Sequence, residues 1–585
     1  MELTKVKIRG FRNFKDATIR LNQKSLIIGS NDIGKTNFFH ALRILLDRGF
    51  SDYDLEPKDS DFYVYEEVNE YTISLYFENV TEDCVVAKLK GRISDNDKFM
   101  LRYQAFRDPD TKAKHYKLWA GPSLAKLEEI EDRFYRKVLN VKYISSRRDF
   151  HAYISREKNH LLETAKANRN PEQITQDDLL YEDIRGELQQ IDKKIPDLHF
   201  ISSATSTINE ELKKLSLHHG KQEINFDAST SNVDAFINNV SISSHTDGKS
   251  ILIGGDGRLN QIYLALWASR NQLTEDNLRE VTIFCIEEPE AHLHPHQQRK
   301  LADYLNVSIA GQVLISSHSP QIASEFSPNS IVRLHKTDGA AKAASDGCSA
   351  VIGEAFEDFG YRMSIIPAEA FFADVVFLVE GPSEQLFYKT LATQLGIDLD
   401  HYNISILMVD GIGFNVFAKI LEALKIEWVM RTDNDIFKLP KKDLYTFAGI
   451  RRGINAYRNY YQADPQMEKI LKAHEVNIRE FPKSMPDPVN IKSAAEIRKA
   501  LEPFNIFLSE VDLENDIYNS KLKKELETFF DLDDKEEILK AMTKNKAIFM
   551  YRFIKKNKAA LPKLKDSPLA APLHVSVKLA QEIHK

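Results

Sequence analysis

The stretch that decides the fold is Gly29-Ser30-Asn31-Asp32-Ile33-Gly34-Lys35-Thr36, which fits the phosphate-binding pattern G-x-x-x-x-G-K-[S/T]. The apolar residues 25–28 before it predict a buried strand, and the apolar spacing of residues 37–46 after it predicts a helix. A glycine-rich turn at a helix N-terminus presents backbone N–H groups to phosphate oxygens, and its Ser or Thr hydroxyl reaches Mg²⁺. The residues we expect to bind a nucleotide here are Gly29, Asn31, Gly34, Lys35, Thr36 and Asn37.

The overall composition sets broad limits. At 585 residues the chain is longer than one hydrophobic core usually fills, so two or three domains are expected. Its net charge of −7 gives no overall attraction to nucleic acid, and DNA contacts would have to come from local basic patches and metal-bridged phosphates. The sequence has no apolar run of about 18 residues and no N-terminal signal-peptide pattern, which predicts a cytoplasmic protein without a membrane partner.

Three later stretches offer the parts that a phosphate loop lacks. Gly255 and Gly257 belong to a glycine-rich turn before an amphipathic helix, a second helix N-terminus for an anion. An apolar strand ends at Glu287 and Glu288, whose side chains point to opposite faces, so one can hold Mg²⁺ and the other polarise a water. Another apolar strand ends at His318, where α/β sheets place ligands. A simple turn and a structural histidine are the competing interpretations.

The second half of the chain has two further strands that end in carboxylates. Residues 373–379 lead to Glu380, with Glu384 in the first turn of the next helix, and residues 426–432 lead to Asp433 and Asp435. If these strands are neighbours, their ends gather carboxylates that repel one another unless a cation neutralises them. Oxygen ligands without His or Cys select Mg²⁺ or Mn²⁺, and paired metals suit phosphodiester cleavage. Solvated loop acids are the alternative.

These motifs resemble known families. The phosphate loop, residues 254–261, 283–295 and 317–320 are similar, in order, to an ABC-type ATPase head, whereas the later acids resemble a Toprim domain. Their fusion resembles the OLD-family nucleases, including the nuclease subunits of Gabija anti-phage systems. The fold class is therefore expected to be α/β, an ABC-type ATPase head with a helical insert, fused to a C-terminal Toprim domain. The signature turn and Glu287 depart from the usual head pattern, which argues against fast ATP turnover.

The resemblance implies roles for individual residues. ATP and Mg²⁺ or Mn²⁺ are the implied cofactors. The implied metal ligands are Glu380, Asp433, Asp435 and Asp512 in the Toprim domain, and Thr36 and Glu287 in the head. Glu384, Glu514 and Lys546 complete the implied catalytic set, and Lys544 is the alternative to Lys546, because either ammonium can stabilise charge on a phosphate. Basic residues including Arg451 and Arg452 are expected to be surface charges that track a DNA backbone.

The expected organisation follows from these assignments. The two halves of the ATPase domain are predicted at residues 1–155 and 221–345, a helical dimerisation insert at 156–220, a linker at 346–370, the Toprim nuclease domain at 371–565 and a tail at 566–585. The expected function is a nucleotide-regulated, metal-dependent DNA endonuclease of phage defence, acting on double-stranded DNA as a homo-dimer or tetramer and restrained by ATP. The resemblance also implies a separate UvrD-type helicase subunit. The alternatives are an ATP-gated DNA-repair or chromosome clamp and a topoisomerase or primase.

Overall fold

A computed structural model describes residues 1–146, 150–215, 233–240, 243–246, 249–252, 256–273, 280–309, 311–349, 368–409, 413–482 and 486–584. Contacts divide the chain into two units. The first consists of Met1–Ser146, Asn277–Glu290 and Pro295–Lys585, and the second of Arg147–Asp276 and Ala291–His294. Among the helices of the described residues, none is both long and apolar enough to cross a lipid bilayer.

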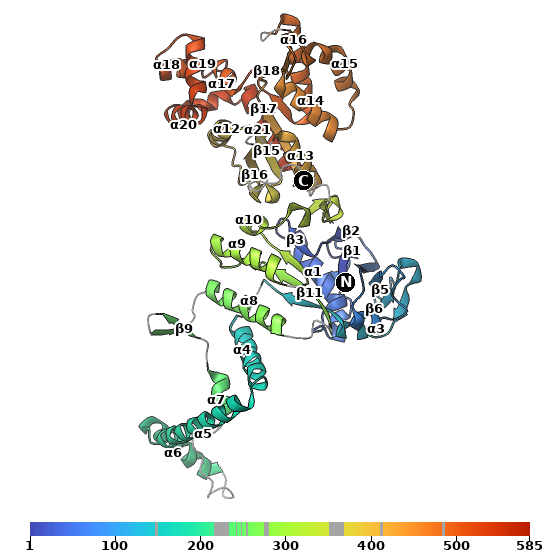
Figure 1. The fold of residues 1–585 in the computed structure, drawn as a ribbon, viewed down its shortest axis with the longest axis vertical. Coiled ribbons are helices and arrows are strands. Elements are labelled where there is room, and N and C mark those ends of the chain that lie inside the picture. The colour runs from blue at the N-terminus through green and yellow to red at the C-terminus, as the bar shows by residue number, and fades with distance from the viewer. Residues whose placement is uncertain are drawn as a thin grey trace. The chain divides into compact units, whose positions relative to one another are not determined.

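The first unit contains a six-stranded sheet that carries the phosphate loop (Figure 1). Its order is β14 (Ala340–Ala343), β13 (Ile331–Thr337), β3 (Lys24–Ile28), β12 (Gln312–Ser316), β11 (Val281–Glu287) and β8 (Leu139–Ile144). All neighbouring strands are parallel except β13 and β14. The strands are short apolar runs, as expected for a parallel sheet covered on both faces. The carboxyl ends of β3, β11 and β12 therefore lie at one edge, where the predicted nucleotide-binding residues follow.

A second, antiparallel sheet packs in the same core. Its order is β2 (Phe14–Arg20), β1 (Glu2–Phe11), β4 (Glu70–Glu78), β5 (Phe99–Arg107), β6 (Lys114–Gly121) and β7 (Glu128–Ile130). The first two strands of the chain, β1 and β2, form an antiparallel hairpin in this sheet. The helix after the phosphate loop, α1 (Lys35–Leu46), buries Phe38, Phe39 and Leu42 in a core shared with both sheets. Shorter helices of this part are α2 (Asp52–Leu55), α3 (Asp83–Lys88), α9 (Pro295–Asp303) and α10 (Pro320–Ala323).

A four-stranded parallel sheet organises the C-terminal half. Its order is β16 (Ile404–Met408), β15 (Val375–Val379), β17 (Glu427–Thr432) and β20 (Ile506–Leu508). The helices α12 (Pro382–Gln394), α13 (Phe414–Ala423) and α21 (Ala571–Ile583) pack against it (Figure 1). The segment expected as a tail thus contributes α21, which contacts β15 and β17. The predicted placing of two acid-bearing strands side by side is confirmed, since β15 and β17 are paired.

Further elements extend this half. The hairpin β18 (Ile436–Lys438) and β19 (Tyr445–Phe447) follows β17 and leads into α14 (Ala448–Tyr460). The remaining helices are α15 (Pro465–Arg479), α16 (Pro488–Leu501), α17 (Leu513–Tyr518), α18 (Lys523–Phe530), α19 (Lys535–Lys544) and α20 (Lys546–Asn557). Of these, α17 begins shortly after β20, and α20 packs against α12.

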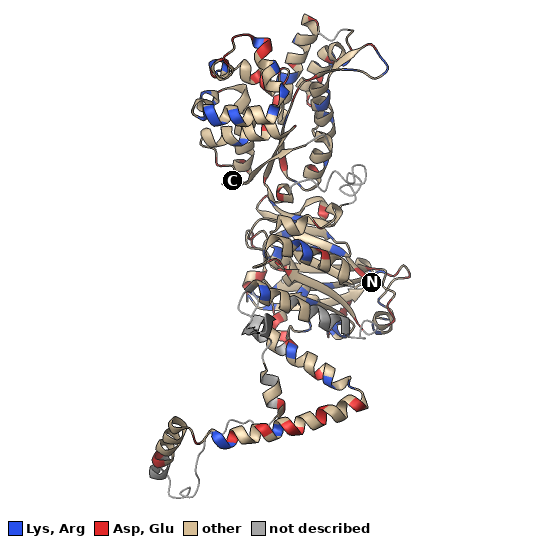
Figure 2. Cartoon of the chain, turned by 60° about the vertical axis from the view of Figure 1, so that its left-hand side comes forward, with Lys and Arg blue, Asp and Glu red and all other residues tan. Residues whose placement is uncertain are grey.

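The second unit is largely helical, and the predicted insert, residues 156–220, falls within its longer range. It contains α4 (Phe150–Ala167), α5 (Pro171–Lys194), α6 (His199–Leu215), α7 (Val233–Asn239), the hairpin β9 (Ser243–Thr246) and β10 (Lys249–Leu252), and α8 (Asp256–Leu273). Charged side chains are spread along α5 (Figure 2). Apolar side chains are nevertheless exposed on α5 and α6, namely Ile174, Leu179, Leu180, Ile191 and Phe200. The predicted ligand Gly255 lies outside the described residues.

Candidate functional site

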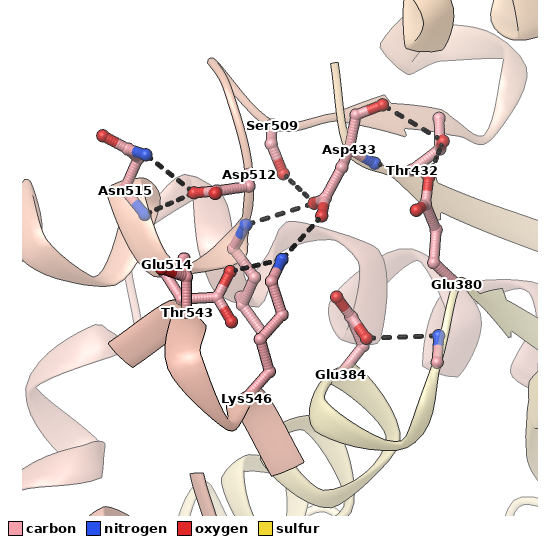
Figure 3. A network of polar contacts seen from close by, with 12 residues as sticks. Glu380, Glu384, Thr432, Asp433, Ser509, Asp512, Glu514, Asn515, Thr543 and Lys546 are labelled. Carbon is pink, nitrogen blue, oxygen red and sulfur yellow. Dashed lines mark hydrogen bonds and ion pairs between the residues drawn. The ribbon is translucent and has the colours of Figure 1, made fainter. Parts of the chain in front are cut away.

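The carboxyl ends of β15, β17 and β20 bring together most of the acidic residues predicted from the sequence (Figure 3). Glu380 directly follows β15, and Asp433 directly follows β17. Glu384 lies in the first turn of α12, where its Oε2 accepts a hydrogen bond from the Gly381 N–H at 3.2 Å. The remaining acids, Asp512 and Glu514, lie at the start of α17, just beyond β20.

Asp433 lies at the centre of this acidic edge. Its side chain is buried, and Oδ1 accepts hydrogen bonds from the Ser509 hydroxyl at 3.0 Å and from the Leu513 N–H at 3.1 Å. Burial raises the pKa of Asp433 to about 8, and repulsion from Glu380 and Glu384 adds to the effect of burial against the attraction of Arg431. A bound cation would therefore stabilise the ionised form of this side chain.

Lys546 links two acids from different elements. Its Nζ lies 2.9 Å from Glu514 Oε2 and 3.8 Å from Asp433 Oδ2. Although burial lowers its pKa, the carboxylates of Glu514 and Asp433 outweigh that effect and raise the pKa of Lys546 above its ordinary value. Lys546 is therefore held as a cation within the acidic edge. The alternative lysine, Lys544, is exposed at the end of α19.

Two of the predicted metal ligands are placed differently from the rest. Asp512 caps α17, with Oδ1 accepting hydrogen bonds from the backbone N–H and the side-chain amide of Asn515, both at 2.8 Å. This is an N-cap, a structural role that leaves the second carboxylate oxygen for other use. Asp435 is exposed on the loop after β17, where its carbonyl accepts from the Ala448 N–H.

Three polar residues that support the acids were not predicted from the sequence. Thr432 donates its hydroxyl to Glu380 Oε1 at 2.5 Å, and Ser509 donates to Asp433. Arg431 is buried within β17 and donates to Asp516 Oδ2 at 2.6 Å. An arginine inside an otherwise apolar strand is a visible signal, because a buried guanidinium requires a carboxylate partner. Thr432 and Ser509 carry no comparable signal.

The donor chemistry of this edge fits a hard divalent cation. Among the described residues, no group of three or more His, Cys, Asp or Glu side chains is already arranged to hold a metal ion. The side chain of Glu514 is nevertheless fully buried, and its Oε1 has no hydrogen-bond partner within the part of the chain that the structure describes. The Lys546 ammonium faces Oε2, so Oε1 is the oxygen left for a metal ion, and oxygen ligands favour Mg²⁺ or Mn²⁺. Glu380, Asp433 and Glu514 are the residues that would hold it.

The phosphate loop has the geometry that a nucleotide requires. Gly29 and Gly34 have φ values of 150° and 112°, and a Cβ at Gly34 would lie 2.5 Å from the Asn13 amide. The Lys35 ammonium donates to the carbonyls of Gly29 at 2.9 Å and Ser30 at 2.8 Å, and burial lowers its pKa to about 8. The first turn of α1 contains no acid, so its N-terminus favours an anion.

The other residues of this loop divide by exposure. Asn31 and Thr36 are exposed, so their side chains are accessible to a ligand and its metal. Asn37 instead bonds within the protein, donating to Asn13 Oδ1 at 2.9 Å and accepting from Arg12 at 2.9 Å. Arg12 also pairs with Asp61 at 2.9 Å, so it is a structural support of the loop and not a free surface charge.

Glu287, Glu288 and His318 lie at the same sheet edge as Lys35. Glu287 ends β11 and is buried, and Glu288 follows with a φ of 42°. The Glu288 Oε1 lies 3.9 Å from His318 Nε2, and burial lowers the pKa of that histidine. Glu287, Glu288 and His318 are thus gathered by parallel strand ends. Gly257 lies in the second unit, where a Cβ on it would be 2.4 Å from the His292 carbonyl oxygen.

Glu290 was missed as a supporting residue of the nucleotide edge. Its Oε1 accepts from the Ser317 hydroxyl at 2.6 Å and from the His318 N–H at 2.9 Å. Burial raises the pKa of Glu290, although these hydrogen bonds oppose the change. The carboxylate fixes the turn that carries His318. Its position two residues after the predicted pair Glu287 and Glu288 was the available signal.

Arg333 connects the strand beside the phosphate loop to the C-terminal sheet. It lies buried on β13, and its guanidinium donates to the carbonyls of Leu424 at 3.3 Å, Lys425 at 2.8 Å and Ala373 at 3.0 Å. The next residue, Leu334, has its carbonyl so close to Gly29 that a Cβ there would be 2.6 Å away. Ala373 precedes β15, and Leu424 and Lys425 precede β17, so Arg333 contacts the amino-terminal side of these strands, whereas the acids follow their carboxyl ends.

Two family models match the chain. A model described as "AAA ATPase domain" matches residues 1–323. A model described as "Overcoming lysogenization defect protein-like, TOPRIM domain" matches residues 371–435, which include Glu380, Glu384, Asp433 and Asp435. The α/β head and the C-terminal Toprim domain expected from the sequence are thereby confirmed.

The chain is also similar to named proteins. "Endonuclease GajA" of Bacillus cereus (strain VD045) is 26% identical over 565 residues, which cover 91% of this chain and 92% of the relative. "OLD nuclease" of Thermus scotoductus (strain ATCC 700910 / SA-01) is 27% identical over 202 residues, or 32% of this chain and 37% of the relative. A solved SMC head bound to the C-winged helix domain of ScpA is 16% identical, with a TM-score of 0.34, and the match covers 59% of this chain and 97% of that chain.

Proposed function

Because this chain belongs to the AAA ATPase domain family and carries an OLD-like Toprim domain, we propose that it is a nucleotide-regulated, divalent-metal-dependent DNA endonuclease. One observation carries the proposal: Asp433 and Glu514, both buried, meet the Lys546 ammonium beside Glu380 and Glu384. Buried charged groups are costly to stability, and they cluster at functional sites. Acids around a lysine are therefore better explained by binding of a metal ion and a phosphodiester than by a structural role. The names of the two relatives, an endonuclease and a nuclease, point to the same chemistry.

Each group has a distinct task in this proposal. Glu380, Asp433 and Glu514 would hold the cation, with Glu384 and Asp512 beside them, and Mg²⁺ or Mn²⁺ would activate the attacking water and stabilise the leaving oxygen. Lys546, kept protonated by its acidic neighbours, would stabilise the charge that develops on the scissile phosphate. Double-stranded DNA is the proposed substrate, because a phosphodiester backbone matches both the cation and the lysine.

ATP is proposed to restrain the nuclease and not to power it. Cutting needs no ATP, and Glu287 stands where fast ATPases of the head type carry an aspartate. The bonds of Arg333 support a route by which a ligand on the phosphate loop biases the Toprim sheet. A cavity of about 460 Å³ also borders the loop residues Gly29–Ile33 and the Toprim residues Lys425 and His584. A nucleotide that prefers one arrangement of these parts shifts the population toward it.

Assembly and biological role form the last part of the proposal. The exposed apolar side chains of α5 and α6 support a homo-dimer or tetramer formed through the helical insert. The similarity to GajA along most of both chains supports a role in anti-phage defence inside the cytoplasm, together with a separately encoded UvrD-type helicase subunit. These roles add to the nuclease chemistry and do not alter it.

Incubation of the purified protein with supercoiled plasmid and Mg²⁺ or Mn²⁺ tests the proposal. A nuclease converts the plasmid to nicked or linear DNA, and chelation of the metal stops the reaction. An ATP-gated clamp would shift the plasmid on a gel without cutting it, and a topoisomerase would relax it without leaving ends. Either of those results would replace the endonuclease proposal with the corresponding alternative.

A further inference from the structure

The helix α14 is fixed to the loop that carries Asp433. The Ala448 N–H donates to the Asp435 carbonyl at 2.8 Å, and the Ile450 N–H donates to Asn434 Oδ1 at 3.2 Å. Gly449 lies so close to this loop that a Cβ would be 2.3 Å from the Asp433 carbonyl, so no side chain fits at position 449. The start of α14 therefore belongs to the frame of the acidic edge.

Arg452, which the sequence analysis had grouped with surface charges, reaches from this helix to Glu380. Its Nη2 donates to Glu380 Oε1 at 2.6 Å and to the Asp433 carbonyl at 2.8 Å. The Nε atom is shielded from solvent, and the guanidinium lies 6.0 Å from the centre of the Phe414 ring. Arg452 is therefore paired with an acid of the site, although its side chain remains 37% exposed. The neighbouring Arg451 is exposed.

The hydrogen bonds to the Glu380 carboxylate are concentrated on one of its two oxygens. Oε1 accepts from the Thr432 hydroxyl at 2.5 Å, the Asp433 N–H at 2.9 Å and Arg452 Nη2 at 2.6 Å. An oxygen with these three donors has little remaining capacity for another partner. The carboxylate is thereby held in one orientation, with Oε2 as its available oxygen.

We propose that Arg452 is a positioning residue of the nuclease site, which locks Glu380 Oε1 against β17 and so presents Oε2 to the divalent cation. The inference rests on the proposed nuclease function and assigns to it a residue outside the acidic motifs. Arginine suits the task, because a charge-assisted hydrogen bond to a carboxylate is short and directional. Its positive charge also offsets part of the repulsion between Glu380 and Asp433, since it contacts both residues.

The test compares Arg452→Ala, Arg452→Lys and Arg451→Ala with the wild type. Arg451→Ala removes the same charge from the adjacent position of α14 without touching Glu380. Binding of Mn²⁺ alone is followed by electron paramagnetic resonance, in the absence of DNA. Plasmid cleavage is then measured across DNA and Mn²⁺ concentrations to separate kcat from KM. Thermal unfolding identifies any variant that fails to fold, in which case Arg452→Lys carries the test.

We expect Arg452→Ala to weaken Mn²⁺ binding or lower kcat by about 10- to 100-fold, the usual effect of removing a support of a metal ligand. Arg452→Lys should recover part of the loss, because an ammonium can still donate to Glu380. The Mn²⁺ measurement keeps the inference separate from the proposed function, since it gives a result even if the protein cuts no DNA.

Three results would overturn the inference. Unchanged Mn²⁺ binding together with unchanged kcat in Arg452→Ala would show that Glu380 needs no such support. Tighter Mn²⁺ binding in that variant would show that the guanidinium competes with the cation. An equal rise of KM in Arg451→Ala and Arg452→Ala, with kcat unchanged, would assign both arginines to a DNA-binding surface.

Discussion

The ammonium nitrogen of Lys546 lies 2.9 Å from an oxygen of Glu514, a carboxylate with no solvent exposure. The two residues lie in the first turns of different helices, α20 and α17, and the same ammonium faces Asp433 after β17. The lysine thus joins helices from the end of the Toprim domain to the strand edge where the acids meet. This relationship distinguishes Lys546 from Lys544, which the sequence left as alternatives.

We expect Lys546→Ala to lose plasmid cleavage by at least about 100-fold, a typical effect of removing a group that stabilises developing charge. Lys544→Ala should retain most of the activity, because Lys544 is exposed. Initial rates at saturating Mg²⁺ give the comparison. If Lys544→Ala is the inactive variant and Lys546→Ala cuts normally, the role assigned to Lys546 is wrong.

The raised pKa of Asp433 predicts how stability depends on pH. In the folded, metal-free protein this pKa is about 8, whereas its ordinary value is 3.8, so between these pH values the folded state holds a proton that the unfolded chain has released. Asp433 therefore reduces the free energy of unfolding as pH rises from about 4 to about 8. Asp433→Asn should show a smaller decrease in Tm over this range.

The measurement is thermal unfolding in EDTA at several pH values from 5 to about 8.5. Glu384 and Glu514 also have pKa values raised by burial, so the Tm of the variant should still decrease somewhat as pH rises. Added Mn²⁺ should raise the wild-type Tm most at the alkaline end, where Asp433 is ionised. If Tm changes equally with pH in the wild type and in Asp433→Asn, the prediction that buried Asp433 holds a proton is wrong.

Nucleotide restraint predicts a gain of activity from a damaged phosphate loop. Lys35→Ala removes the ammonium at the centre of the loop and should weaken ATP binding, so the variant should cut DNA at ATP concentrations that silence the wild type. Cleavage is measured against ATP at fixed free Mg²⁺, because ATP chelates the metal. A wild-type rate that rises with ATP, or equal inhibition of Lys35→Ala, would rule out restraint.

Arg333→Met provides the matched control for this test. It leaves Lys35 in place but removes the donors to the Leu424, Lys425 and Ala373 carbonyls. If Arg333 carries the restraint, the variant should bind ATP as the wild type does and yet escape inhibition. Normal inhibition of Arg333→Met would assign the coupling to another contact.

The exposed apolar side chains of the insert predict its use in self-association. Leu179 and Leu180 are 71% and 60% exposed on α5, and a double substitution to Asp should shift the protein toward monomers in light scattering. Val476→Asp is a suitable control, because Val476 is 77% exposed on α15, outside the insert. An unchanged mass for the α5 variant would place the subunit contact elsewhere.

The features that could be predicted from the sequence are those set by short, continuous stretches of residues. Lys35, Glu380 and Asp433 follow apolar strands, and Glu287 ends one. Parallel pairing then places such positions at one edge of each sheet. The division into an ATPase head and a Toprim domain followed from the same motifs. Apolar patterns placed the strand ends, and the resemblance of the motifs to known families supplied the two domains.

The supporting residues were less visible because their partners are distant in the chain. Arg452 bonds Glu380 across 72 positions, and Ser509 bonds Asp433 across 76. An arginine on an amphipathic helix has the pattern of a surface charge, whereas the structure packs the start of α14 against the Asp433 carbonyl at Gly449. Such contacts depend on how helices pack, which spacing along the sequence does not specify.

The most direct test of the account compares plasmid cleavage by the wild type with Glu380→Ala, Asp433→Ala and Asp512→Ala, while ATP binding is measured on the same samples. The account predicts metal-dependent cutting by the wild type, its abolition in the three variants, and unchanged ATP binding, because the substitutions lie in the Toprim domain and leave the phosphate loop intact. Cleavage near the wild-type rate by all three variants would contradict the assignment of the nuclease site.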